Sequence, residues 1–435
     1  MARLLLKGGR LLDPRLGLDQ EADLLITGSV IARIEPDLEP EPGTRVLDCR
    51  GRVVAPGFID LHVHLRDPGF EWKEDIASGT RAAARGGFTA VVAVPNTRPV
   101  IDNAQMVAYV LEKARREAVV KVLPMGAVTK GQEGKELAEL GEMAAAGAVA
   151  FSDDGNPVEN AELMRLALLY ARQFGRPVMD HCEDRTLSRG GAMHPGPWCT
   201  RMGLPPFDPL AEEVHVARDI LLAEATGGHV HIMHVSSARS VDLIRWAKAR
   251  GVPVTAEATP HHFTLTDEDL YRAGYDTNYK MSPPLRSARD REAIIAGLAD
   301  GTIDAIATDH APHHRDDKEV EFALAANGVT GLETAVSLTL DRLVRPGYLS
   351  LERAILALST RPAEILGIRP PTLQVGAEAD ITVLDLERRV TVRPEEMASK
   401  SRNTPFLGWE LVGAPVATIV SGRLVMEEGR IVAGQ

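Results

Sequence analysis

The sequence predicts an α/β fold, a (β/α)8 TIM-type barrel with a small β-sandwich domain formed from both termini. The middle of the chain alternates eight short β-rich runs with stretches of helical period, and both ends are rich in strand-forming residues. No GxGxxG or GxxxxGK[ST] loop supports the alternative, a doubly wound open sheet with a nucleotide site. We expect the barrel over residues 57–368 and the small domain over residues 1–56 plus 369–435.

Composition limits the partners of the chain. Its 435 residues are 44% hydrophobic and 25% charged, which excludes a disordered or fibrous protein. Lys and Arg total 49 against 61 for Asp and Glu, without a basic block, so nucleic acid and anionic membranes are poor partners. No apolar run approaches the roughly 18 residues of a membrane span, and the N-terminus lacks a signal-peptide layout. The three cysteines form no CxxC pair, so we expect unpaired thiols in a cytoplasmic protein.

The first and last stretches of the chain are typical of strands. Short β-forming runs separated by Gly, Pro and Asp cover residues 4–12, 23–34 and 45–56. After a Pro- and Gly-rich linker at residues 369–380, similar runs cover residues 381–386, 388–392, 415–425 and 429–435. Two strand-rich ends around a long middle predict one β domain built from both.

Eight runs in the middle predict the barrel strands. They cover residues 58–64, 88–95, 119–128, 148–153, 177–182, 229–235, 252–259 and 303–309. Four of the intervening stretches have a helical period, at residues 74–87, 103–118, 160–175 and 211–227. In such a barrel the active site lies where the strands end and the following loops begin.

Side chains that bind metals recur at the ends of five predicted strands. They are His62 and His64 on the first strand, Asp153 and Asp154 on the fourth, His181 on the fifth, His234 on the sixth, and Asp309 with His310 on the eighth. Residues two apart on a strand point the same way, so His62 and His64 face one spot. A single HxH pair is ordinarily two hydrogen-bonded buried histidines, but this many ionisable groups are costly to bury without a cation.

Four histidines and two carboxylates exceed the ligands of one tetrahedral zinc ion. The sequence therefore predicts two divalent metal ions, with Zn²⁺ the best match to the ligands. Such a pair binds a shared hydroxide at neutral pH and polarises a carbonyl oxygen, which is hydrolytic chemistry. No flavin, haem or nicotinamide motif points to redox work.

Five segments carry a resemblance to a known family. They are DLHVHLRDPG at residues 60–69, VPNTRP at 94–99, FSDDGNPV at 151–158, YKMSPPLR at 279–286 and ATDHAPHHRDDK at 307–318. Together they resemble dihydroorotases of the bacterial class I type, within the amidohydrolase superfamily, over essentially the whole chain. Hydantoinases and allantoinases share relatives of the first and last segments, so neither is specific alone.

The resemblance implies roles for the metal ligands. It places His62, His64 and Asp309 on one metal and His181 and His234 on the other, with Asp154 as the bridge. In many relatives a carboxylated lysine is the bridge, but the fourth predicted strand contains no Lys. The resemblance also implies that Asp309 is the catalytic acid and base, which takes the proton of a metal-bridging hydroxide and delivers it to the leaving nitrogen.

The resemblance also implies a set of substrate contacts. They are His64, Arg66, Asn96, Ser282, His313, Asn327 and Gly328. An arginine after a strand is usually solvated, but at the barrel mouth its planar fork can hold the carboxylate of dihydroorotate. Asn96 has an alternative as a turn residue in PNTRP. The family commonly has Asn at position 282 and Phe at position 327, so the pocket wall departs from the family there.

The function that the resemblance implies is reversible hydrolysis of (S)-dihydroorotate to N-carbamoyl-L-aspartate in pyrimidine (UMP) biosynthesis. One alternative is a hydantoinase, dihydropyrimidinase or allantoinase, which Arg66 and the absent lysine disfavour. Another is an inactive dihydroorotase-like subunit that serves as a scaffold for aspartate transcarbamoylase. Complexes with aspartate transcarbamoylase are known in the family, and an active enzyme could form one as well. The sequence also leaves open whether the chain forms a homo-oligomer. Among the remaining histidines, we expect His215 to lie exposed on a helix, and we assign it no role.

Overall fold

The structure, a computed structural model, describes residues 2–432. Its centre is a sheet of eight strands in which each strand pairs in parallel with the next along the chain. The strands are β6 (Phe58–Val63), β7 (Phe88–Ala93), β8 (Lys121–Gly126), β9 (Ala150–Phe151), β10 (Val178–Asp180), β11 (Val230–Ile232), β12 (Val254–Ala258) and β13 (Ala305–Ile306). The sheet closes beyond β13, where His310 N–H donates to His62 O at 3.2 Å and His310 O accepts from His64 N–H at 2.9 Å. All eight expected strands and the (β/α)8 barrel are confirmed.

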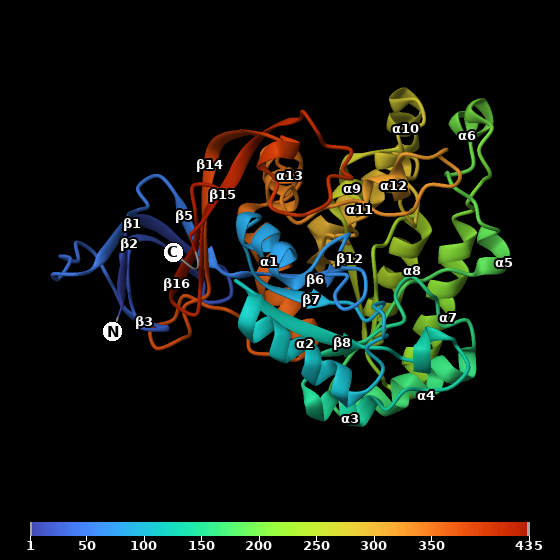
Figure 1. The fold of residues 1–435 in the computed structure, drawn as a ribbon, viewed down its shortest axis with the longest axis horizontal. Helices are drawn as coiled ribbons and strands as arrows, with labels where there is room; N and C mark the ends of the chain where they lie inside the picture. The colour runs from blue at the N-terminus through green and yellow to red at the C-terminus, as the bar shows by residue number, and fades with distance from the viewer. Residues whose placement is uncertain (1, 433–435) are drawn as a thin grey trace.

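Helices cover the outside of the barrel (Figure 1). They are α1 (Ile76–Arg85), α2 (Ala104–Glu117), α3 (Leu140–Ala146), α4 (Ala161–Arg172), α7 (Leu210–Thr226), α8 (Ala238–Ala249), α11 (Ala288–Asp300), α13 (Ala335–Thr339), α14 (Leu351–Ile355) and α15 (Arg361–Leu366). The π-helical turn η3 (Leu340–Val344) follows α13, and a second one, η4 (Leu356–Thr360), joins α14 to α15. Side-chain caps begin several of them, such as Asp75 at α1 and Asn160 at α4, which accept from backbone N–H groups of the first turn. The four helices expected from their period are α1, α2, α4 and α7.

The loops at the carboxyl ends of the strands contain short helices of their own. These are η1 (Lys130–Gln132), α5 (Arg185–Ser188), α6 (Pro197–Met202), α9 (Pro260–Thr264), α10 (Asp267–Ala273), η2 (Thr277–Tyr279) and α12 (Arg315–Lys318). They surround the end of the barrel at which the expected ligands lie.

A second sheet, built from both ends of the chain, lies beside the barrel (Figure 1). It contains β1 (Arg3–Asp13), β2 (Leu18–Thr27), β3 (Val30–Glu35), β4 (Arg45–Asp48), β5 (Val53–Pro56), β14 (Ile381–Thr391), β15 (Glu410–Val420), β16 (Arg423–Glu427) and β17 (Arg430–Ile431), with η5 (Pro394–Glu396) between β14 and β15. The two ends join where β5 pairs with β14 antiparallel and with β1 in parallel.

Side chains from both ends form one apolar core within this sheet, for example Leu24, Val54, Ile381 and Ile419. The expected composite β unit is therefore confirmed. The run expected at residues 388–392 is the end of the long β14, and residues 433–435 of the last run lie outside the described residues. The domain limits at residues 56 and 368 stay a prediction.

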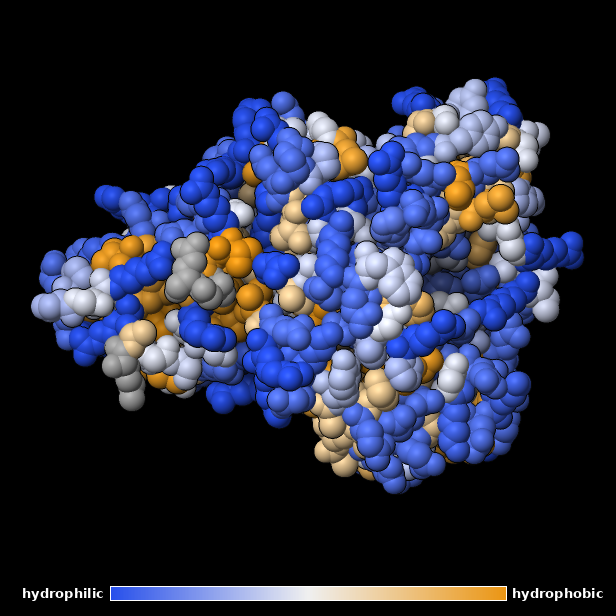
Figure 2. Space-filling model, viewed as in Figure 1, coloured by the Kyte–Doolittle hydropathy of each residue, from blue (hydrophilic) through white to orange (hydrophobic). Residues whose placement is uncertain are grey.

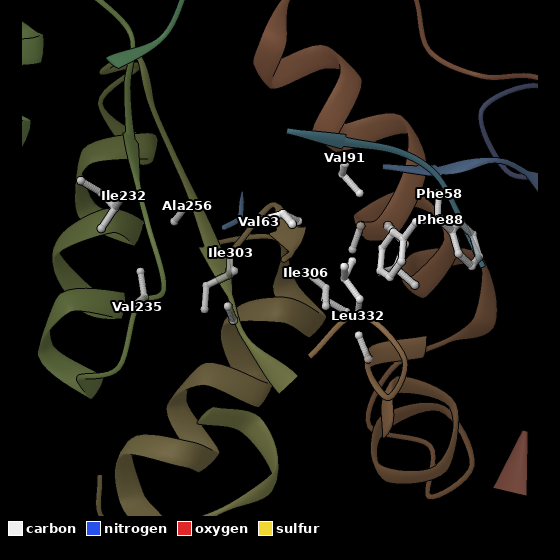
Figure 3. Packing of buried hydrophobic residues seen from close by; sticks show 14 of the residues in the cluster. Phe58, Val63, Phe88, Val91, Ile232, Val235, Ala256, Ile303, Ile306 and Leu332 are labelled. Atoms are coloured by element: carbon white, nitrogen blue, oxygen red, sulfur yellow. The ribbon is translucent and has the colours of Figure 1, made fainter. Parts of the chain in front are cut away.

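The barrel and its helices share one hydrophobic core. Phe58 and Phe88, which begin β6 and β7, are register partners and lie next to one another, with Leu332 close by (Figure 3). Both rings are fully buried, and each contributes roughly 1.5–3 kcal/mol of hydrophobic free energy. This packing supports the amino ends of the strands and leaves their carboxyl ends to polar side chains.

The surface is mostly hydrophilic on the face seen in Figure 2, where hydrophobic residues gather in small patches over the terminal sheet and near α6. No helix among residues 2–432 is long and apolar enough to cross a membrane. The cysteines Cys49, Cys182 and Cys199 are free, as the sequence predicts, and all three are buried.

Candidate metal centre and active site

Six side chains expected to bind metal lie together at the carboxyl ends of the barrel strands. They are His62 in β6, His64 directly after it, Asp154 after β9, His181 directly after β10, His234 after β11 and Asp309 after β13. All six are buried, with exposed fractions that run from 0% for His62 to 7% for Asp309. Six ionisable groups thus share one water-poor space.

The first set of ligands has the spacing of a metal site. His62 Nε2 lies 3.3 Å from Asp154 Oδ2 and 3.4 Å from Asp309 Oδ1. His64 Nε2 lies 3.3 Å and 3.1 Å from the same two oxygens. Ligand atoms on a tetrahedral zinc ion with bonds of about 2.0–2.2 Å stand about 3.3–3.6 Å apart. The four His–Asp separations are therefore close to those around one such ion.

The other oxygen of Asp154 faces a second pair of histidines. Asp154 Oδ1 lies 3.7 Å from His181 Nδ1 and 3.7 Å from His234 Nε2. These two nitrogens are 2.9 Å apart. One carboxylate thus faces two histidine pairs with its two oxygens, which is the arrangement of a bridging ligand.

A cation fits the electrostatics of this cluster. The Nε2 atom of His62 is buried and has no hydrogen-bond partner. Burial lowers the pKa of His62, but the charges of Asp154 and Asp309 outweigh burial and raise that pKa well above its usual value. Positive charge is therefore stabilised at this nitrogen, and a metal ion bound to its lone pair satisfies the orphaned atom and both carboxylates.

Hydrogen bonds behind the ligands leave the inward-facing nitrogens free. His62 Nδ1 lies 2.8 Å from Glu257 Oε1, and because a carboxylate only accepts, Nδ1 carries a proton and Nε2 is the nitrogen at which a metal ion could take the place of a second proton. Glu257 also accepts from His231 Nε2 at 3.1 Å. His64 Nδ1 lies 3.0 Å from Asn96 Oδ1, which leaves His64 Nε2 as the ligand atom.

His181 follows the same arrangement. Its Nε2 donates to Glu183 Oε2 at 3.0 Å, so its Nδ1 faces Asp154. Glu183 and Glu257 were missed by the sequence analysis. A signal was present for Glu257, because an acidic residue inside an otherwise apolar barrel strand requires a buried partner.

Three residues of the site have a left-handed backbone. The φ angles are 61° at Arg66, 32° at His234 and 47° at Asp309. A non-glycine residue with positive φ costs of order 1–3 kcal/mol, and such residues gather at functional sites. The folded barrel therefore holds these side chains in directions that an ordinary strand or helix does not provide.

A cavity of about 240 Å³ opens over the metal ligands. The residues that line it are His64, Arg66, Asn96, Asp154, Gly155, His181, Glu183, His234, Ser282, Asp309, Ala311, His313, Asn327 and Gly328. All expected substrate contacts are among them, with five of the six expected ligands. His62 is not among the lining residues and is completely buried.

One cation faces this cavity. Arg66 Nε donates to Pro312 O at 3.1 Å, and burial lowers the pKa of Arg66 to about 10, so the guanidinium stays charged at neutral pH. His313 is neutral, because burial, Arg66 and Lys73 lower its pKa to about 3. His313 Nε2 donates to Asn327 O at 2.8 Å. The cavity therefore combines side chains that could hold metal ions with one arginine that can bind an anion.

Asp153, the neighbour of Asp154, points elsewhere. Its Oδ1 accepts from the N–H groups of Val128 at 2.8 Å and Thr129 at 3.1 Å. Burial raises the pKa of Asp153 to about 6. Asp153 thus holds the loop after β8, whereas Asp154 faces the histidines.

The expectation that His215 is exposed is wrong. His215 lies in α7 but is only 4% exposed, and its Nε2 lies 2.8 Å from Asp180 Oδ2. Asp219 lies beside this pair, and its Oδ1 accepts from Arg218 Nη2 at 2.6 Å. The helical period of a sequence identifies the buried face of a helix from its apolar residues. It therefore does not predict the burial of a histidine that faces a buried carboxylate. His215 and Arg218 thus contact the two buried carboxylates of this second cluster.

Comparison with known proteins identifies the family. The dihydro-orotase-like family matches residues 51–240, and the Amidohydrolase family matches residues 222–426. A dihydroorotase from Pelotomaculum thermopropionicum is 55% identical over 426 residues, which are 98% of this chain and 99% of the relative. The chain belongs to the dihydroorotase family. A second dihydroorotase, from Citrifermentans bemidjiense, is 52% identical over 424 residues, with 98% and 99% of the two chains covered.

Solved structures agree with the fold of this dihydroorotase-family chain. An L-hydantoinase (dihydropyrimidinase) from Arthrobacter aurescens has a TM-score of 0.88 at 28% identity and covers 100% of this chain and 98% of its own. A D-hydantoinase from a Thermus species has a TM-score of 0.82 at 30% identity, with 99% and 96% covered. The family resemblance and the barrel expected from the sequence are both confirmed.

The structure accounts for one departure of this dihydroorotase-family chain from the common pattern. Position 327 is Asn where the family commonly has Phe, but the contact to His313 is made by the Asn327 backbone carbonyl. This contact therefore does not depend on the side chain at position 327. The following Gly328 has φ 149°, and a Cβ there would stand 2.7 Å from Ala311 O, so this position requires glycine.

Proposed function

We propose that this chain is a dihydroorotase. It hydrolyses the ring amide of (S)-dihydroorotate to N-carbamoyl-L-aspartate, and in the biosynthetic direction it closes the ring for pyrimidine synthesis. The observation that carries the proposal is the charged Arg66 in the same cavity as the buried His and Asp cluster. Dihydroorotate carries a carboxylate next to its ring, whereas hydantoin and the dihydropyrimidines do not, and a guanidinium fork matches a carboxylate.

The six clustered side chains would hold two divalent cations. His62, His64 and Asp309 would bind one and His181 and His234 the other, with Asp154 between them. Zn²⁺ best matches this set of imidazole nitrogens and carboxylate oxygens. When bound, such ions supply an acidic water and polarise the carbonyl oxygen of the amide.

Asp309 is the proton carrier of the proposed mechanism. Burial raises its pKa, but the neighbouring histidines, His62 and His64 foremost, outweigh burial and hold the pKa well below its usual value, so Asp309 is ionised. It accepts the proton of the attacking water and delivers it to the ring nitrogen as the amide bond breaks. In ring closure Asp309 removes the proton from the ureido nitrogen instead.

Arg66 and its neighbours would orient the substrate. The guanidinium takes the substrate carboxylate, and the neutral His313 and the amide of Asn96 line the same cavity. The net charge of the protein is −12, so local positive charge is needed to attract an anionic substrate.

The solved hydantoinases support a second candidate, a cyclic amidohydrolase for uncharged rings. Arg66 argues against it, because an uncharged ring offers no anionic partner to this buried guanidinium. No lysine lines the described cavity, so a carboxylated-lysine bridge has no residue to form on. An inactive scaffold is disfavoured because all six ligand positions hold metal-binding side chains. Association with aspartate transcarbamoylase stays a prediction.

Substitution of Arg66 tests this function. We expect wild-type protein to turn over dihydroorotate far faster than dihydrouracil or hydantoin. Arg66→Met removes a charge-assisted contact of roughly 1.5–3 kcal/mol, so kcat/KM for dihydroorotate should fall by about one to two decades, with much less effect on uncharged rings. The assay follows formation of N-carbamoyl-L-aspartate by chromatography.

The exposed Arg369 provides a matched control, because Arg369→Met removes the same charge far from any described contact of the cavity. This variant should keep wild-type rates on every substrate. If Arg66→Met weakens charged and uncharged substrates equally, Arg66 does not read the carboxylate. A wild-type preference for uncharged rings would contradict the proposed function itself.

A further inference from the structure

A buried asparagine from the C-terminal part of the chain connects two loops of the active-site cavity. Asn403 lies between η5 and β15 and is 4% exposed. Its Nδ2 donates to Ala311 O at 3.0 Å and to Gly328 O at 3.0 Å. Its Oδ1 accepts from His313 N–H at 3.1 Å. One amide thus holds the loop after β13 against the loop that contains Gly328.

The hydrogen-bonding capacity of this side chain is matched to its surroundings. An amide offers two N–H donors and one acceptor oxygen, and at Asn403 both donors and the oxygen are used. The Asn403 carbonyl also accepts from Thr330 N–H at 2.9 Å. A carboxylate has the same shape but no donors, so it cannot replace this amide. A fully satisfied buried network of this kind fixes one geometry.

The two loops touch closely at Gly328. A Cβ at this position would stand 2.7 Å from Ala311 O and 2.9 Å from His313 Cδ2. The Gly328 carbonyl has a second donor, because Lys318 Nζ lies 3.1 Å from it and 2.9 Å from Ala326 O. Two buried donors, Asn403 Nδ2 and Lys318 Nζ, therefore fix the position of the Gly328 carbonyl and with it the separation of the loops.

These loops also support the substrate arginine. Arg66 Nε donates to Pro312 O, which lies between the two residues of this loop that Asn403 contacts. His313, Asn327 and Gly328 line the cavity. A change in the separation of the loops therefore moves the guanidinium and the opposite wall relative to one another, whereas every expected metal ligand except Asp309 lies on or after a different strand.

We propose that Asn403 is a positioning residue for substrate binding: it sets the separation of the Ala311–His313 loop and the Asn327–Gly328 wall, and thereby the fit of dihydroorotate. The inference rests on the proposed function. It makes the C-terminal segment between η5 and β15 a part of the active site. The expected consequence is an effect on KM rather than on kcat or metal content.

The isosteric substitution Asn403→Asp tests this inference. It places a carboxylate oxygen against two backbone carbonyls, so the loops should move apart. We expect KM for dihydroorotate to rise at least about tenfold while kcat changes less than about threefold, with the metal content of the wild type. Asn160→Asp is the matched control, since the exposed N-cap of α4 accepts equally well through a carboxylate. It should behave like the wild type.

Two results would overturn the role of Asn403. One is an unchanged KM in folded Asn403→Asp. The other is a parallel loss of kcat and bound metal, which indicates general damage. If Asn403→Asp does not fold, Asn403→Ala removes both donors without adding charge and should still raise KM at least about threefold; an unchanged KM there also overturns the role.

Amide hydrogen exchange separates this inference from the proposed function. Peptides that cover residues 309–330 should exchange faster in Asn403→Asp than in the wild type, with no change elsewhere in the barrel. A wild-type protein that does not turn over dihydroorotate contradicts the proposed function alone. Unchanged exchange in residues 309–330 contradicts the role of Asn403, whatever the substrate.

Discussion

Asp309→Asn should lower kcat by about 100-fold or more while the protein stays folded and keeps metal. The amide has the shape of the carboxylate and retains one oxygen that can bind a cation, but it cannot accept and return a proton. The substitution should therefore lower kcat both for hydrolysis and for ring closure. Steady-state kinetics for hydrolysis and for ring closure, together with metal analysis of the same preparation, measure this effect.

Asp242→Asn is a suitable control for this variant. Asp242 lies on the outer face of α8, where its side chain pairs with Arg245 in solvent, and its conversion to an amide should leave kcat unchanged. Near-normal turnover in Asp309→Asn protein with full metal content would contradict the role of Asp309 as proton carrier.

Asp154→Ala should abolish activity and lower metal stoichiometry or affinity. One carboxylate oxygen of Asp154 faces one histidine pair and the other oxygen faces the second pair. The loss of Asp154 therefore removes a ligand from each proposed metal site. Asp153→Ala is the matched neighbour. It leaves two backbone N–H groups without an acceptor at a cost of about 1–3 kcal/mol, so Tm should fall while metal content and activity persist.

Metal analysis, activity and thermal unfolding of both alanine variants decide this assignment. The opposite pattern, in which Asp153→Ala loses metal and Asp154→Ala keeps it, would contradict it. Because the proposed bridge is an ordinary side chain, added bicarbonate should not change the activity. Bicarbonate-dependent reactivation of metal-loaded protein would mean that a carboxylated lysine takes part.

Much of the barrel could be predicted because strand order follows chain order. Each β-rich run gives one strand, but the strands are shorter than the runs. β9 and β13 contain two residues each, although the corresponding runs span residues 148–153 and 303–309. The polar residues at the ends of these runs leave the sheet to face the centre, as the positive φ of Asp309 shows. Apolar periodicity contains no information about that change of direction.

The clustered site residues could be predicted because strand ends meet in a barrel. What lay beyond prediction were partners that come from distant parts of the sequence. Asn403 is 92 residues from Ala311 along the chain and sits in a loop without a periodic pattern. Glu257 is 195 residues from His62, and its role depends on the buried face of β12. The contacts of Asn403 follow from the packing of loops and cannot be read from a local pattern, and an acidic residue within β12 signals a buried partner without identifying His62.

In the proposed mechanism, a two-cation centre held by this cluster drives hydrolysis of dihydroorotate. Metal analysis coupled to the dihydroorotate assay tests it most directly, with protein measured as purified, after removal of metal by a strong chelator, and after addition of Zn²⁺. We predict two metal ions per chain in active protein, loss of activity in step with loss of metal, and recovery on addition of Zn²⁺. Undiminished turnover of dihydroorotate in protein verified to be free of metal would contradict this mechanism.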